Sequence, residues 1–191
     1  YLGGFYRYGK QDPRIKRTVI GRKWDQWTSA GEDDKIYPTF TASQVDPVSY
    51  PPFPERLRKS IWKGVANSAD AHNKPGTFTT FSGYEWTAMI NRNNLHRVVI
   101  YKDSADKVAQ MAPFSAQSSQ DPRELWKFLA QYEKATDGEV IAIPHNSNLS
   151  GGMMFPDNTV DGNPIDVGYA RMSARWEPLA EVTQVKGDSE T

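Results

Sequence analysis

The sequence contains no cysteine among its 191 residues. Disulfide bonds, thiolate metal sites and a cysteine nucleophile are therefore excluded. Lysine and arginine together number 23, and aspartate and glutamate also number 23, so the formal net charge is zero. A neutral chain lacks the basic excess with which proteins bind nucleic acid or an anionic membrane surface through charge, so we expect no nucleic-acid partner.

Long apolar runs are also missing. No stretch of about 18 consecutive apolar residues occurs, so we expect no membrane span. The first residues, YLGGFYRYGK, lack an initiator methionine and do not follow the pattern of a signal peptide. We therefore expect the chain to have been processed or to be part of a longer polypeptide.

The first quarter of the chain is rich in proline and aromatic residues. Six of the 13 prolines lie in residues 1–55, most densely in DPVSYPPFP at 46–54. Such a composition predicts long loops. We expect 1–55 to be a loop-rich segment that packs on a scaffold formed by 56–191.

Hydrophobic periodicity and capping residues predict two helices. Apolar residues recur at a spacing of four from Leu57 to Ala69, which indicates a helix over 55–72. An aspartate followed by a proline predicts the start of a second helix over 121–138. Apolar, β-branched and aromatic runs predict strands at 77–86, 95–103, 139–145 and 177–187. A helix, a tight turn and a buried strand in succession are typical of α/β layers.

The chain has three histidines, and one of them directly follows a predicted strand. In IAIPHNSN, Pro144 marks the strand end because it cannot donate a ladder hydrogen bond. His145 then lies where α/β folds place reactive side chains, although a histidine there can also simply bond to a loop. His72 lies at the end of the first predicted helix, where an imidazolium favours the helix dipole, and is expected to be structural.

Two glutamates lie in apolar surroundings. Glu85 lies inside a strand-like aromatic run, where a carboxylate is costly unless it is paired, bound to metal or facing solvent. If the strands at 77–86 and 95–103 are neighbours, Glu85 and His96 meet at one rim. Glu181 is also flanked by apolar residues. Glutamates and histidines together suit Zn, Mn or Fe, although no closely spaced metal motif occurs.

Basic residues lie next to the candidate ligands. Arg92, Arg97 and Lys186 could contact an anionic substrate, or they could be ordinary solvated surface charges. Asn146 and Asn148 follow His145 and could support a metal ligand or contact a substrate. A serine hydrolase has little support, because no G-x-S-x-G motif is present.

Five long blocks of the sequence resemble successive blocks of a bacterial domain-of-unknown-function family, number 3604. They are PGTFTTFSGYEWT, NLHRVVIYKD, DPRELWKFL, AIPHNSNLSGGMMF and RWEPLAEVTQVKGDSE, within residues 60–191. That family is related to the PHP (polymerase and histidinol phosphatase) metallohydrolases. The resemblance implies an α/β fold: a partial or distorted PHP-like β/α barrel with long irregular loops and a metal cluster at its strand ends.

The resemblance also implies roles for individual residues. Glu85, His96 and His145 match metal ligands, and Glu181 belongs to a further matching block. We add Glu181 as a fourth expected metal ligand, and Arg97 and Lys186 as expected catalytic residues that neutralise an anion. The expected cofactors are divalent metal ions, Zn, Mn or Fe.

The opening H-x-H strand and the later Asp-His pair of PHP-like proteins do not occur in these 191 residues. We therefore expect this chain to be the middle of a longer polypeptide whose remaining parts are its partners, with a periplasmic or secreted location.

Three functions remain open from the sequence. The first is a metal-dependent hydrolase that acts on a small phosphoester or similar anionic ester. The second is a non-catalytic binding or structural module with an incomplete metal site, which the missing H-x-H favours. The third is a sulfatase-like esterase that uses the same metal site.

Overall fold

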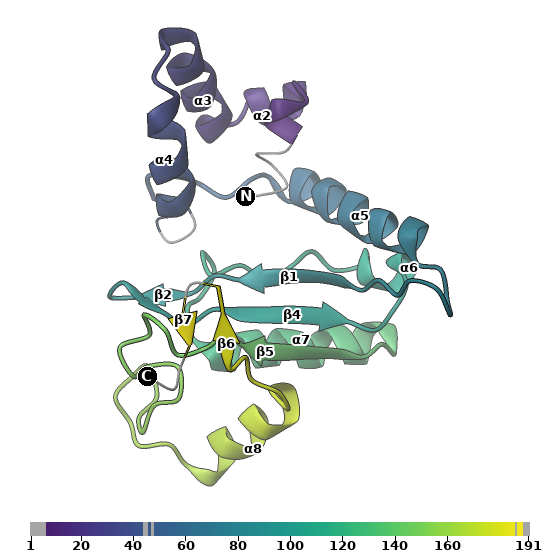
Figure 1. The fold of residues 1–191 in the computed structure, drawn as a ribbon, viewed down its shortest axis with the longest axis vertical. Coiled ribbons are helices and arrows are strands. Elements are labelled where there is room, and N and C mark those ends of the chain that lie inside the picture. The colour runs from purple at the N-terminus through teal and green to yellow at the C-terminus, as the bar shows by residue number, and fades with distance from the viewer. Residues whose placement is uncertain (1–6, 44–45, 47, 186, 189–191) are drawn as a thin grey trace.

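A three-stranded antiparallel sheet lies at the centre of the chain (Figure 1). The computed structural model describes residues 7–43, 46, 48–185 and 187–188. The strands are β1 (Ser82–Trp86), β4 (Arg97–Tyr101) and β5 (Val140–Pro144), in the order β1-β4-β5. Their β-branched and aromatic residues fit a pleated, half-buried surface, and the three predicted strands are confirmed with shorter bounds.

The antiparallel pairing corrects the prediction of a PHP-like β/α barrel. Such a barrel needs parallel strands, each followed by a helix, that close on themselves. Here β4 is antiparallel to both neighbours, and the sheets in the described part of the chain have three, two and two strands and remain open. The prediction of a partial or distorted barrel was therefore wrong.

The connection between β1 and β4 gives the physical reason. A parallel pair needs a crossover of about a dozen residues or more. Instead, β2 (Met89–Ile90) and β3 (Asn93–Asn94) form a small hairpin in this connection. Asn91 and Arg92 occupy its turn with φ of 51° and 67°, the left-handed conformation that tight two-residue hairpin turns require. The chain thus reverses and returns beside β1.

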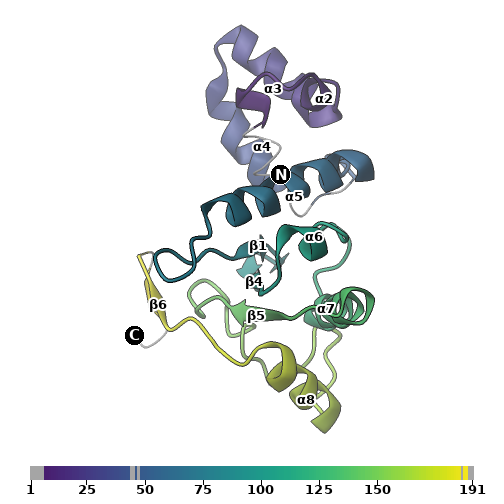
Figure 2. The same cartoon turned by 90° about the vertical axis from the view of Figure 1, so that its right-hand side faces the viewer.

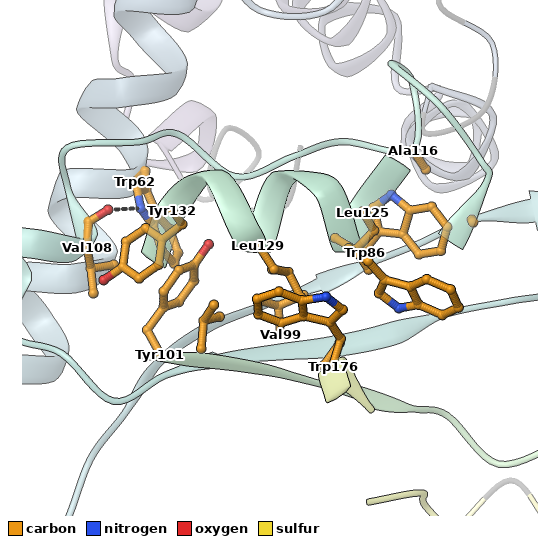
Figure 3. Packing of buried hydrophobic residues seen from close by; sticks show 14 of the residues in the cluster. Trp62, Trp86, Val99, Tyr101, Val108, Ala116, Leu125, Leu129, Tyr132 and Trp176 are labelled. Atoms are coloured by element: carbon orange, nitrogen blue, oxygen red, sulfur yellow. Dashed lines mark hydrogen bonds between the residues drawn. The ribbon is translucent and has the colours of Figure 1, made fainter. Parts of the chain in front are cut away.

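Helices cover one face of the sheet (Figures 1 and 2). They are α5 (Glu55–His72), α6 (Ala105–Val108), α7 (Pro122–Thr136) and α8 (Val167–Trp176). α7 presents Leu125, Leu129 and Tyr132 to the buried sheet residues Val99 and Tyr101 (Figure 3). Burial of this apolar surface is the main stabilisation of the central unit.

Capping explains why the predicted helices form where they do. The side chain of Asp121 accepts a hydrogen bond from the backbone N–H of Arg123, and Pro122 occupies the first position of α7. Asp137 ends α7 in the left-handed conformation. α8 was not predicted, although Asp166 caps it by accepting from the N–H of Tyr169.

Helices between residues 13 and 42 correct the prediction of loops there, whereas residues 48–54, in the proline-dense stretch, form no helix or strand. These helices are α2 (Pro13–Lys16), α3 (Val19–Ala30), the 3-10 helix η1 (Asp33–Lys35) and α4 (Ile36–Ala42). Pro13 counted as a loop signal in the sequence, but it occupies the first helical position after the N-cap Asp12. The side chain of Arg14 holds the pKa of Asp12 down, at about 2.

A second apolar cluster joins this segment to the rest of the chain. It contains Tyr8, Ile15, Ile20, Trp24, Phe53 and Leu57. Leu57 belongs to α5, so the cluster crosses the expected boundary between 55 and 56. In Figures 1 and 2, α2 to α4 lie on the far side of α5 from the sheet.

The C-terminal segment contains less strand than predicted over 177–187. Among the residues described there, β6 (Thr183–Gln184) and β7 (Gly187–Asp188) pair as a short antiparallel hairpin. Across the described ranges, none of the helices combines the length and apolar character needed to cross a bilayer.

A buried ion pair ties α8 to the sheet. Nε of Arg97 lies 3.1 Å from Oε1 of Glu177, and their side chains are only 2% and 5% exposed. Oε1 of Glu177 also accepts from the indole N–H of Trp126 at 2.8 Å, and the Arg97 guanidinium lies over the ring of Trp86. Both charges are thus satisfied inside the core.

We predict that Arg97→Met lowers the free energy of unfolding by about 3–5 kcal/mol, because it leaves the Glu177 carboxylate buried without its cation. Adding Glu177→Gln should recover part of the loss, since the amide oxygen still accepts from Trp126. Lys127→Met, which breaks the exposed pair with Glu124, should cost less than about 1 kcal/mol. Urea unfolding measures all three; equal losses in the two single variants would contradict the prediction.

Candidate functional site

The predicted ligands meet at one end of the three-stranded sheet. Glu85 is the penultimate residue of β1, His96 immediately precedes β4, and His145 immediately follows β5. Because the strands are antiparallel, these three positions fall at the same end. The backbone N–H of His145 donates to the carbonyl of His96 at 3.0 Å, and the two ring centroids are 5.5 Å apart.

Alternation along the strands places the site on the face opposite the helices. Trp86 and its register partner Arg97 point into the core, so the flanking Glu85 and His96 point the other way. Val98, the register partner of Glu85, is 40% exposed on that face. The site therefore lies on the less covered side of the sheet.

His96 is held through one ring nitrogen, and the other is buried. Its Nδ1 lies 3.1 Å from Oε1 of Glu85. A carboxylate only accepts hydrogen bonds, so Nδ1 carries the proton and Nε2 of the neutral ring has a lone pair. Nε2 is buried and has no hydrogen-bond partner within the described ranges. Burying an acceptor without a hydrogen-bond partner costs free energy, so we expect a ligand to bind at this nitrogen.

His145 has the same tautomer for a similar reason. Its Nδ1 donates to the backbone carbonyl of Asn146 at 2.8 Å, and a carbonyl can only accept. The lone pair is again on Nε2. The amide nitrogen of Gln184 lies 2.5 Å from this Nε2 and 3.4 Å from Nδ1.

Glu181 lies beside His145 because the C-terminal segment runs along the end of β5. The backbone N–H of Glu181 donates to the carbonyl of Pro144 at 2.9 Å. Its Oε2 accepts from the backbone N–H of Asn146 and from the amide of Gln184, both at 2.9 Å. The same oxygen is 4.0 Å from Nδ1 of His145.

The two asparagines shape the loop after β5. Asn146 is fully buried, and its backbone bonds to both residues of this pair. Its carbonyl accepts a hydrogen bond from His145, and its N–H donates one to Glu181. Its side-chain oxygen accepts from the backbone N–H of Asn148 at 3.2 Å. The backbone of Asn146 thus connects His145 to Glu181, while the expected roles of Asn146 and Asn148 at a metal or a substrate stay predictions.

The structure brings the four predicted ligands together as two pairs. One pair is Glu85 with His96, and the other is Glu181 with His145. Within the part of the chain that the structure describes, no group of three or more histidines and carboxylates could hold one metal ion. A tetrahedral metal needs four ligands, so each pair leaves coordination positions for water, substrate or further groups.

Among the described residues, the predicted cations Arg92 and Arg97 do not join these pairs. Arg97 is committed to its ion pair with Glu177 and to the carbonyl of Leu95, on the opposite face of the sheet from His96. Its predicted contact with an anionic substrate at the histidines does not fit this geometry. Lys186 lies outside the described residues. Arg92 is exposed in the β2–β3 turn.

His72 lies away from the site. Its Nδ1 lies 2.7 Å from the carbonyl of Ser68 in the last turn of α5, in keeping with its expected structural role. Sequence reasoning missed Gln184 and Glu177. The sequence signal for Gln184 was weak: it lies three residues after the candidate ligand Glu181.

Comparison with known families gives one match over the whole chain. A family model described as "Protein of unknown function (DUF3604)" matches residues 1–191. This range includes the first 55 residues, which the five resembling blocks do not cover. The comparisons with curated proteins and with solved structures give no match.

Proposed function

The chain belongs to the DUF3604 family of proteins of unknown function, and we propose that it is a metal-dependent hydrolase of a phosphoester or a similar anionic ester. The observation that carries the proposal concerns the two ring nitrogens of His96. Nε2 is buried and has no hydrogen-bond partner among the described residues, and Nδ1 is hydrogen-bonded to Glu85. The proposal includes a relationship of this family to the PHP metallohydrolases. We base that relationship on the sequence blocks around the histidines, and it does not require the chain to form a barrel.

The two histidines fit a metal site in their tautomers and partners. A metal-ligating histidine commonly donates its other ring N–H to a carboxylate or a backbone carbonyl, which fixes the ring and raises its basicity. Glu85 has this position for His96, and the carbonyl of Asn146 has it for His145. We therefore assign Glu85 the role of orienting His96.

The candidate donors suit a borderline divalent ion. Each pair offers donors that Zn, Mn and Fe accept: Nε2 of His96 in one, and Nε2 of His145 with the carboxylate of Glu181 in the other. When bound, such an ion lowers the pKa of water and neutralises charge on an ester oxygen. The carboxylate of Glu181 offsets part of the ion's charge, and Asn146 fixes the spacing between Glu181 and His145.

Substrate access follows from the position of the site. Glu85 and Val98 are partly exposed on the face away from the helices, so an ester can approach the histidines from that side. Arg97 does not contribute to anion binding in this proposal, because its side chain is in the core. A role for Lys186 in neutralising the anion stays a prediction.

The first test is metal binding by histidine variants. We expect His96→Ala and His145→Ala each to weaken Zn or Mn binding by more than about 100-fold, since losing a ligand exceeds the 10- to 100-fold cost of losing a supporting residue. His72→Ala is the matched control. Elemental analysis and competition with a chromophoric chelator measure binding, and a screen of aryl phosphates measures turnover. Normal metal content in His145→Ala would refute its role.

Glu85→Gln tests the orienting role separately. The amide oxygen can still accept from Nδ1 of His96, but the negative charge that raises ring basicity is lost. We expect metal affinity to fall about 10- to 100-fold, with little change in stability because the Glu85 side chain is 46% exposed. Glu139→Gln, at an exposed site paired with Lys102, is the control. An unchanged affinity would remove Glu85 from the site.

A second candidate function is a non-catalytic binding or structural module. The observation that favours it is the arrangement of the described ligands in pairs, without a complete group of three. Folded protein that takes up none of Zn, Mn or Fe would support this module over the hydrolase. If metal binds, aryl sulfates in the substrate screen distinguish a sulfatase-like esterase from a phosphoesterase.

A further inference from the structure

The amide of Gln184 lies between two of the proposed metal donors. Its nitrogen is 2.5 Å from Nε2 of His145 and 2.9 Å from Oε2 of Glu181. The group facing Glu181 must be the amide NH₂, because the carboxylate only accepts hydrogen bonds. One uncharged donor group therefore contacts both an imidazole and a carboxylate.

This position conflicts with a bound metal ion. An ion held by an imidazole nitrogen and a carboxylate oxygen lies about 2.0–2.2 Å from each. The amide nitrogen already occupies the space beside both donors, and its N–H hydrogens would point their positive ends at the cation. His145 and Glu181 thus cannot share an ion while Gln184 stays where it is.

We propose that Gln184 is a built-in competitor of the metal ion, which closes the His145–Glu181 pair in the metal-free protein and leaves when the ion binds. This inference rests on the proposed metal-dependent function and adds a regulatory contact to that site. The amide compensates the Glu181 carboxylate and keeps it beside His145, so the pair stays assembled without a cation.

Little apolar burial holds the described residues around Gln184 in place. β6 pairs over two residues, and the neighbouring Val182 and Val185 are exposed. Glu181 is anchored separately, through its N–H to the carbonyl of Pro144. Gln184 can therefore swing away while Glu181 keeps its place.

Zinc affinity of variants tests the competition. We expect Gln184→Ala to bind Zn²⁺ roughly 5- to 30-fold more tightly than the native chain, because the ion no longer displaces two hydrogen bonds. Gln184→Glu should bind more tightly still, since it adds a third ligand to the pair. Thr183→Ala, on the same strand, should leave affinity unchanged. Competition with a chromophoric chelator gives the dissociation constants.

The outcomes separate this inference from the proposed function. If the native chain binds zinc and Gln184→Ala binds equally or more weakly, the competition is overturned and the metal site stands. If neither the native chain nor any Gln184 variant binds zinc, both fail. Zinc binding by Gln184→Ala alone would support the competition strongly.

Hydrogen exchange gives a second, independent readout. In the native chain, zinc should speed amide exchange at Thr183 and Gln184, because the hairpin is released when the side chain leaves the site. Slower exchange at these residues in the presence of zinc would mean that Gln184 helps to hold the ion, and would overturn the competition.

Discussion

The antiparallel pairing of β4 with both β1 and β5 is the constraint on which the rest of this structure depends. It brings the end of β1, the start of β4 and the end of β5 to one edge. Successive residues point to opposite faces, so the pairing also separates neighbours in sequence. His96 faces the open side, and Arg97 faces the core, although the two are adjacent in the chain. One register therefore creates both the candidate site and the buried ion pair behind it.

The core side of the sheet explains why the site can be rigid. Trp86, Val99 and Tyr101 pack against α7, and the Arg97–Glu177 pair attaches α8 beneath the same strands. Burial raises the pKa of Tyr101 well above its usual value, which keeps the phenol neutral inside this aromatic layer. Around Gln184, by contrast, Val182 and Val185 are exposed. The proposed competition therefore involves histidines held by the sheet and a side chain from a segment with little apolar burial.

Local signals predicted the local structure well. The bounds of α5 agree with its four-residue apolar spacing, and α7 begins where Asp121 and Pro122 indicated. The same kind of signal was misread in the first quarter, where prolines suggested loops although Pro13 begins a helix. The predicted barrel failed for a different reason. A short apolar strand has the same appearance in sequence whether its neighbours run parallel or antiparallel to it.

The sequence by itself determined which chemistry is possible, because it contains no thiols, three histidines, and two glutamates, Glu85 and Glu181, within apolar runs. It also indicated the strand end at His145 and the two strands near Glu85 and His96, whose pairing only the structure established. Only the tertiary structure decided which nitrogen of His96 and of His145 can bind a ligand. It also decided that Arg97 is buried and that Gln184 and Glu181 lie next to His145. The burial of Arg97 and the contacts at His145 and Asn146 depend on residues 35 to 80 positions apart, as for Asn146 with Glu181 and Arg97 with Glu177, and local patterns carry no information about such pairing. The ring nitrogens depend on nearer partners, Glu85 for His96 and the carbonyl of Asn146 for His145, whose geometry the sequence does not specify.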